Sequence, residues 1–213
     1  MAEIRDTSPT GAQKALIDAG LALFGTKGFD ATSTRELAST AGVNVALIAY
    51  HFGGKEGLRQ AVVAEIGRRM SQVVGLPPVP AGLTADAAQE RLQMVVRQIV
   101  AFLVGAREAE PLVNFMLHEL AQGGPQIDAI YQRFVGPKHS ELSELWAIAT
   151  GLNAESDHVK LSIFAMIGQV VYFRLGREVV TRKMGWTAIG PDEVGRIADL
   201  IADNVRLLTQ RGT

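Results

Sequence analysis

The sequence predicts an all-α protein with a small N-terminal helical domain and a larger C-terminal one. Hydrophobic residues make up 47% of its 213 residues and aromatic residues only 6%, a composition typical of helical globular proteins. Apolar residues recur at helical spacing, and cap residues, glycines and prolines divide this pattern into segments. The Pro-rich stretch 76–82 cannot continue a helix, so it marks the boundary between the two domains.

Residues 33–58 hold two short helical patterns separated by a glycine. Ser33 and Glu36 have the S/T-x-x-E spacing of a capping box, so a helix is expected to begin near Thr34. Gly42 lies where a helix end favours a residue that can adopt positive φ, so the helix is expected to end there.

A second helix is expected from Val45 to Phe52, because Asn44 is a good N-cap and no breaker occurs before Gly53. Two helices of about two turns each, joined by a short turn that contains glycine, form a helix-turn-helix. The second helix of such a unit lies in the DNA major groove. The segment therefore predicts a DNA-binding head.

Two flanking helices complete this head. A helix over residues 12–25 is expected to pack behind the helix-turn-helix, and Phe29 is expected to cap the small core. Another helix runs from Lys55 to about Val74. The apolar stripes of these two helices are Leu16, Ala19, Leu23 and Phe24, and Leu58, Val62, Ile66 and Val73.

Beyond the domain boundary, helical segments are expected at residues 87–106, 108–121 and 126–149. The first of these has a strong amphipathic pattern. The Gly136-Pro137 pair is expected to kink or split the third.

The last two segments carry an excess of apolar surface. Residues 156–184 are apolar nearly all round, which predicts a helix buried on more than one side, and Gly168 and Gly176 suggest the close approach of another backbone. The last helix follows a break at residues 185–191 and repeats apolar residues at alternating four- and three-residue spacing, like a coiled-coil seam. This pattern favours a homodimer formed through the last two helices of each subunit.

A longer series of residue types surrounds the helix-turn-helix. It comprises Phe24, Lys27-Gly28-Phe29, Thr32 to Arg35, Ala41-Gly42-Val43, Tyr50-His51-Phe52 and Lys55-Glu56-Gly57-Leu58. This series, within a stretch from Lys14 to about Val74, resembles the DNA-binding domain of TetR-family transcriptional regulators. The apolar penultimate helix and the Tyr50-His51-Phe52-Gly53 sequence resemble a CecR-like branch.

The pattern and the resemblance together predict a domain organisation in four parts. They are a disordered arm at 1–10, the helix-turn-helix DNA-binding domain at 11–54, a connecting helix at 55–75 and a ligand-binding and dimerisation domain at 76–213.

The resemblance implies that Val45, Ala46 and Ala49 face the DNA groove; otherwise they are simply small side chains of an exposed helix. Such side chains can touch thymine methyl groups but cannot make bidentate hydrogen bonds to bases. Two residues depart from the family pattern. Leu47 replaces a frequent hydroxyl residue and Ala49 a frequent tyrosine, so at least one usual phosphate contact is expected to be missing.

The resemblance also implies contacts to the DNA backbone. Tyr50 and His51 match an aromatic residue and an imidazole that touch the sugar-phosphate backbone. Lys55 matches a phosphate-binding lysine at the start of the fourth helix.

Three polar residues near the helix starts are further candidates. Arg35 either pairs with guanine O6 and N7, clamps a phosphate or is solvated. Thr34 is a candidate phosphate ligand. Asn44 is either an N-cap or a DNA contact.

The net charge of −1 does not provide a generally basic surface. Residues 1–75 contain 8 Lys/Arg and 7 Asp/Glu, and the remaining residues contain 13 and 15. DNA affinity must therefore come from a few well-placed cations and from helix N-termini directed at phosphates.

Several other classes of protein find no support. Cysteine is absent, which excludes disulfide and thiolate chemistry. The N-terminus lacks the apolar segment of a signal peptide and no apolar run reaches membrane-spanning length, so a soluble cytoplasmic protein is expected. No metal site, cofactor or enzymatic activity is expected, because no catalytic or phosphate-binding motif occurs and the four histidines lie far apart in the sequence.

A small-molecule cavity is expected in the C-terminal domain, where bulky apolar side chains occur together with a few hydrogen-bonding groups. The alternative is that most of these residues form ordinary core. The candidates are Phe102, Asn114, Phe115, His118, Tyr131, Phe134, Trp146, Gln169 and Tyr172.

The sequence thus predicts a homodimeric, ligand-responsive repressor that a small hydrophobic effector releases from a palindromic operator on double-stranded DNA. The alternative is an all-α small-molecule carrier or enzyme whose N-terminal helices have lost DNA binding. The departures at Leu47 and Ala49 and the weak positive charge support that alternative. Salt-dependent binding to DNA distinguishes the two hypotheses.

Overall fold

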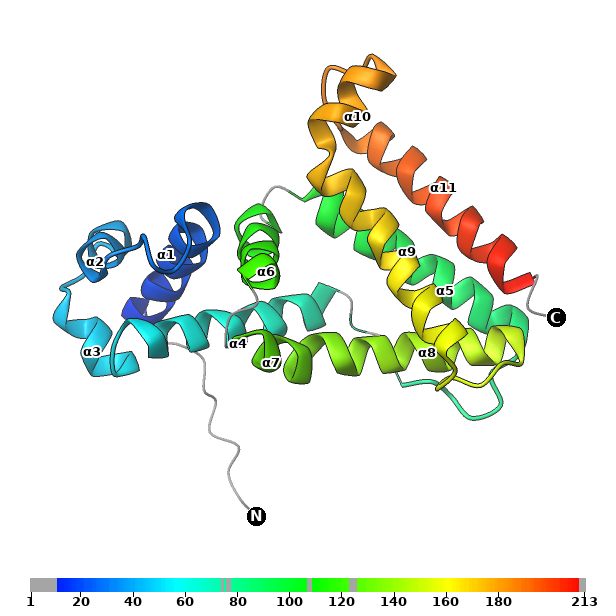
Figure 1. Ribbon diagram of the computed structural model, residues 1–213, viewed down its shortest axis with the longest axis horizontal. Coiled ribbons are helices and arrows are strands. Elements are labelled where there is room, and N and C mark those ends of the chain that lie inside the picture. Colours follow the sequence, from blue (N-terminus) through cyan, green and yellow to red (C-terminus); the bar gives the residue numbers. More distant parts are fainter. Residues whose placement is uncertain (1–10, 74, 76–77, 107–108, 123–125, 211–213) are drawn as a thin grey trace. The chain divides into compact units, whose positions relative to one another are not determined.

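The computed structural model describes residues 11–73, 75, 78–106, 109–122 and 126–210. All regular elements in this part of the chain are helical, which confirms the predicted all-α class (Figure 1). The arm predicted at residues 1–10 lies outside the described residues.

The chain forms two compact units that do not follow the chain order. Unit 1 comprises the residues up to Arg68 and the later segment Glu110–Ile130. Unit 2 comprises Arg69–Ala109 and the chain from Tyr131 onward. A helix from the middle of the sequence is therefore part of the same compact unit as the N-terminal helices.

Unit 1 contains the helix-turn-helix. Its elements are α1 (Gly11–Lys27), α2 (Thr34–Ala41), α3 (Ala46–Phe52), the larger part of α4 (Lys55–Val73), α6 (Glu110–Gln122) and α7 (Gln126–Ile130). Helices α2, α3 and α6 all pack against α1. The large side chains of its core are Leu16, Phe24, Leu37, Ile48, Leu58 and Phe115.

Local hydrogen bonds set both ends of α2. The Ser33 hydroxyl oxygen accepts a hydrogen bond from the Glu36 backbone N–H at 3.1 Å, as expected of an N-cap. Gly42 has φ 66°, and the Val43 N–H donates to the Ala38 carbonyl at 3.0 Å, as in a Schellman motif. The predicted start and end of this helix are confirmed.

Helix α6 approaches the end of α1 closely. A Cβ at Gly25 would lie 2.8 Å from the carbonyl oxygen of Pro111 and 3.1 Å from the backbone nitrogen of Phe115. The rings of Phe24 and Phe115 pack with their centroids 6.3 Å apart. Glycine at position 25 therefore permits the backbone-to-backbone contact of these two helices.

Unit 2 is a separate helical bundle. Its elements are α5 (Ala85–Val100), two π-helical turns (Ala101–Gly105 and Tyr131–Val135), α8 (Gly136–Thr150), α9 (Asp157–Leu175), α10 (Arg177–Met184) and α11 (Pro191–Gln210). Helix α5 packs against both α8 and α11. The buried side chains include Leu92, Val96, Leu145, Trp146, Ile163, Ile201 and Val205. Helix α8 begins at Gly136 directly after a π-helical turn, and Val135 is still in the right-handed helical region, so the chain stays helical here and the predicted kink or split stays a prediction.

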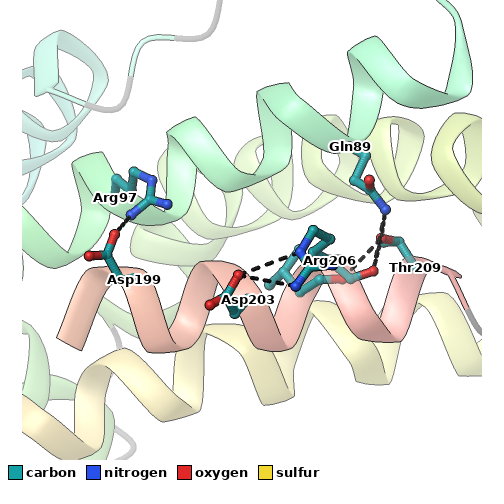
Figure 2. A network of polar contacts seen from close by, with 7 residues as sticks. Gln89, Arg97, Asp199, Asp203, Arg206 and Thr209 are labelled. Atoms are coloured by element: carbon teal, nitrogen blue, oxygen red, sulfur yellow. Dashed lines mark hydrogen bonds and ion pairs between the residues drawn. The ribbon is translucent and has the colours of Figure 1, made fainter. Parts of the chain in front are cut away.

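Polar contacts near both ends fix the pairing of α5 with α11 (Figure 2). The Gln89 side-chain amide donates to the Thr209 hydroxyl at 2.7 Å. Eight residues later on α5, Arg97 forms an ion pair with Asp199. Since the partners run in opposite order along the two sequences, the helices are antiparallel.

The expectation of one helix over residues 156–184 is wrong, because the segment forms two helices. Helix α9 ends before Gly176, and α10 continues at an angle of 76° to it. Glycine has a low helix propensity, and a Cβ at this position would lie 3.0 Å from the carbonyl oxygen of Tyr172. In the described part of the chain, no single helix has both the length and the apolar character to cross a membrane, and only this bent pair reaches them jointly.

The burial expected around the penultimate segment is not achieved within one chain. At Gly168, where close backbone approach is expected, no described atom beyond its chain neighbours and its own helix backbone lies within 4 Å of the place that a Cβ would occupy. Large apolar side chains on α9 and α11 are exposed. We call this surface the α9–α11 face; it comprises Leu161, Phe164, Gly168, Tyr172 and Leu175 with Leu200, Leu207 and Leu208.

Gly57, in the first turn of α4, has no room for a side chain, because a Cβ there would overlap the backbone oxygen of Phe52. We expect Gly57→Ala to lower the free energy of unfolding by about 1–3 kcal/mol, the typical cost of overpacking. Urea denaturation measures this change. Gly67→Ala is the matched control on the same helix.

Beyond its chain neighbours and its own helix backbone, no described atom lies within 4 Å of a Cβ at Gly67. Alanine at this position should raise the free energy of unfolding by up to about 1 kcal/mol through its helix propensity. If Gly57→Ala and Gly67→Ala changed the free energy of unfolding by similar amounts, the tight turn between α3 and α4 would be contradicted.

Candidate nucleic-acid interface

Helix α3 buries one side and exposes the other. Ile48 packs into the core of unit 1, whereas Val45, Ala46, Ala49 and Tyr50 are exposed. Tyr50 has 80% of its surface exposed, an unusually large fraction for a tyrosine of a folded helix. The four side chains expected to face outward therefore do so, and their contact with DNA stays a prediction.

The turn before α3 explains the role of Asn44. Its side-chain oxygen accepts a hydrogen bond from the Ala46 backbone N–H at 2.9 Å. Of the two roles that the sequence allows, the structure shows the helix cap. On α2, Thr34 is partly exposed and Arg35 is exposed, so Arg35 is available to a partner.

At the other end of α3, three rings follow one another. The Tyr50 and His51 ring centroids lie 4.9 Å apart in an edge-to-face arrangement, and the His51 and Phe52 centroids lie 6.1 Å apart. Tyr50 therefore stands next to the imidazole that is expected to touch the same DNA backbone. Gly53, with φ 71°, ends the helix directly after these rings.

Ion pairs neutralise half of the described Lys and Arg residues of unit 1. The pairs are Lys27 with Glu36, Arg59 with Glu119 and Arg68 with Glu65. A cation paired with a carboxylate contributes less to phosphate binding, because the two charges largely cancel at the distance of a ligand. The formal count of positive charges therefore overstates what unit 1 offers to DNA.

The other described Lys and Arg residues of unit 1 are Lys14, Arg35 and Lys55. Among the residues that the structure describes, no carboxylate lies within ion-pair distance of any of them. Sequence reasoning selected Arg35 and Lys55 but missed Lys14, because no motif marks it. Lys14 becomes a candidate only because three other cations of the same unit are paired with carboxylates.

Lys55 is the first residue of α4, and Gly53 and Gly54 precede it with positive φ. Its ammonium nitrogen lies 4.2 Å from the centroid of the Phe29 ring. A lysine at a helix N-terminus adds its charge to the backbone N–H groups that have no partner in the helix. This end of α4 is therefore suited to an anion.

The nine candidate ligand residues divide between the two units. Asn114, Phe115 and His118 lie on α6, in unit 1, and the other six lie in unit 2. Phe115 is buried against Phe24, and the His118 imidazole lies directly over Gly28. These three side chains are not gathered in one unit with the rest, and their role in ligand binding stays a prediction.

The six candidates in unit 2 have different surroundings. Phe102, Tyr131 and Phe134 lie in the two π-helical turns, which often mark functional positions. Tyr131 and Tyr172 are exposed, whereas Trp146 is buried and its indole N–H has no hydrogen-bond partner among the described atoms. The Gln169 side-chain oxygen accepts from Asn204 at 2.9 Å. In the described residues no three His, Asp or Glu side chains gather as metal ligands.

Comparison with known proteins matches both parts of the chain. Residues 16–62 match the family described as bacterial regulatory proteins, tetR family. Residues 88–211 match the C-terminal domain of the HTH-type transcriptional dual regulator CecR.

Two relatives illustrate the similarity. The chain is 31% identical over 209 residues to the HTH-type transcriptional dual regulator CecR of Shigella flexneri, which covers 93% of this chain and 92% of that protein. It is 34% identical over 105 residues to the probable HTH-type transcriptional regulator YttP of Bacillus subtilis, which covers 49% of this chain and 48% of that protein.

Solved structures share the fold. AibR, in complex with isovaleryl coenzyme A and operator DNA, has a TM-score of 0.64 and 20% identity, over 90% of this chain and 96% of that chain. A TetR-like transcriptional regulator from Rhodococcus sp. RHA1 has a TM-score of 0.62 and 18% identity, over 96% and 97% of the two chains.

We expect Tyr50→Ala to weaken DNA binding about tenfold, the equivalent of one hydrogen bond to a charged phosphate. The side chain is exposed, so the melting temperature should not change. Fluorescence anisotropy on the DNA upstream of the protein's own gene measures the affinity. Gln60→Ala, at an exposed position of α4, is the control; an unchanged affinity of Tyr50→Ala would count against the docking of α3.

Proposed function

Because this chain belongs to the TetR family of bacterial transcriptional regulators and carries a CecR-type C-terminal domain, we propose that it is a homodimeric repressor released from a palindromic operator by a small-molecule effector. The observation that carries the proposal is the exposed α3 surface, in the same unit as Lys14, Arg35 and Lys55, for which no described residue supplies a carboxylate partner. The relatives are transcriptional regulators and not enzymes, which weighs against the carrier or enzyme alternative.

On DNA, α3 enters the major groove and Val45, Ala46 and Ala49 face the bases. Arg35 supplies direct reading of a base edge or a phosphate clamp, and Thr34 binds a phosphate. Tyr50, His51 and Lys55 hold the sugar-phosphate backbone. The heads of two subunits occupy half-sites about 34–36 Å apart, one turn of the double helix.

The second subunit covers the α9–α11 face. Exposed large apolar side chains gathered on a few helices mark protein interfaces, because they remain in water in an isolated chain. Its residues lie on two helices, so two copies form a bundle of four. Gly168 lies within the stripe on α9 and permits a close approach of the partner helix.

The proposed regulator acts in the cytoplasm, on the DNA of the nucleoid. The domain organisation with a head at 11–54, a connecting helix at 55–75 and a ligand-binding and dimerisation domain at 76–213 belongs to this proposal. The effector is small and hydrophobic; AibR, which shares the fold, has been solved with isovaleryl coenzyme A and operator DNA.

An effector acts through different affinities for two states of the protein, one of which fits the operator. A thermal-shift screen of small hydrophobic compounds, acyl thioesters included, identifies it, since a ligand that binds only the folded state raises the melting temperature. The Shigella relative is described as a dual regulator. When the gene of this protein is deleted, expression of the target gene should therefore be tested for a rise as well as for a fall.

Phe164→Asp and Leu200→Asp place a charge on the α9–α11 face at positions that are exposed in the single chain. We expect each to convert a dimer into a folded monomer at micromolar concentration, measured by light scattering after gel filtration and by circular dichroism. Met94→Asp changes an exposed apolar residue of α5 outside this face and should leave the dimer intact. A monomeric wild-type protein would refute the proposed assembly.

Lys14, Arg35 and Lys55 of two subunits supply six cations to the DNA. Each neutralised phosphate contributes a slope of about 0.9, so the logarithm of the association constant should fall with the logarithm of salt concentration with a slope of about −5. Anisotropy titrations between 50 and about 200 mM salt measure the slope. Binding without salt dependence, or no binding to any DNA, would favour the carrier or enzyme alternative.

A further inference from the structure

Lys55 has two unusual neighbours. Its ammonium nitrogen lies 4.2 Å from the Phe29 ring centroid, and the guanidinium carbon of Arg59 lies 4.3 Å from the same centroid. Lys55 and Arg59 are one helical turn apart on α4, so they stand on the same side of that helix. One aromatic ring therefore contacts both cations.

The ring itself is held in place. Phe29 packs against Phe24 with centroids 5.4 Å apart, and Phe24 is buried in the core of unit 1. Arg59 is equally fixed, because its guanidinium makes two hydrogen bonds to Glu119 of α6, at 3.1 and 2.6 Å. Both partners are buried, with only 6% and 1% of their surfaces exposed.

The two cations differ in their charge balance. Glu119 neutralises Arg59, and Glu56 lies 3.8 Å from the same guanidinium. No carboxylate among the described residues pairs with Lys55. The face of an aromatic ring attracts a cation without cancelling its charge. Lys55 is thus held by a neighbour that leaves its full positive charge to a further ligand.

We propose that Phe29 is a positioning residue of the DNA interface, whose ring, fixed by Phe24 and Arg59, holds the Lys55 ammonium at the N-terminus of α4 for a DNA phosphate. This inference rests on the proposed function. A lysine side chain has many rotamers in water, and a ring that restricts them before binding reduces the entropy lost on binding.

A double-mutant cycle tests the proposal through DNA affinity at one fixed salt concentration. Phe29→Leu keeps an apolar side chain but removes the aromatic face. We expect it to weaken binding about 2- to 5-fold when Lys55 is present. In the Lys55→Ala background it should have no further effect, and Phe29→Tyr, which retains the ring, should bind like the wild type.

A second series avoids any effect on packing. Phenylalanine analogues with one, two or three ring fluorines, introduced at position 29, keep the shape of the ring and weaken its attraction for cations. The affinity for DNA should fall stepwise with fluorination in the wild-type background and stay constant in Lys55→Ala, at an unchanged melting temperature.

Three results would overturn the proposal. If Phe29→Leu lowers the affinity for DNA equally in the wild-type and in the Lys55→Ala backgrounds, Phe29 only supports the core. An unchanged affinity of Lys55→Ala shows that this lysine does not bind a phosphate. In both cases the wild type still binds DNA with the expected salt slope, so the proposed function stands. A wild type without salt-dependent binding refutes both.

Discussion

The buried ion pair between Arg59 and Glu119 is the constraint on which unit 1 depends. The two residues are 60 positions apart in sequence, and both are almost completely withdrawn from water. Removal of one partner would leave an uncompensated charge in the interior, at a cost of about 3–5 kcal/mol. The pair therefore obliges α6 to stay on α4, beside the helices that present the candidate DNA interface.

This constraint gives α6 a place in the head. Gly25 allows the backbone of α6 to approach α1, and Phe115 joins the ring of Phe24. The same helix carries three candidate ligand residues, and the same arginine holds the ring beside Lys55. A ligand that contacts α6 would thus act on a helix that belongs to the DNA-binding unit, through side chains that are already packed together.

Sequence reasoning succeeded where the determining interactions are local. Ser33 and Gly42 set the two ends of α2 through neighbours within a few residues, and the structure places those ends as predicted. The outward direction of Tyr50 follows from helical spacing with Ile48. The break at Gly176 was missed, because a glycine within an apolar segment is compatible with a continuous helix as well as with a bend.

The sequence by itself determined the all-α class, the helix-turn-helix, the family and the side of α3 that faces water, since caps, periodicity and motif order are properties of adjacent residues. Only the tertiary structure decided which charges are paired. Among the described residues, Lys27 and Arg59 each pair with a carboxylate whereas Lys14 and Lys55 do not, and α6 belongs to unit 1 and not to unit 2. These contacts join residues that are distant along the chain, and their energies depend on burial and geometry, which no local pattern encodes.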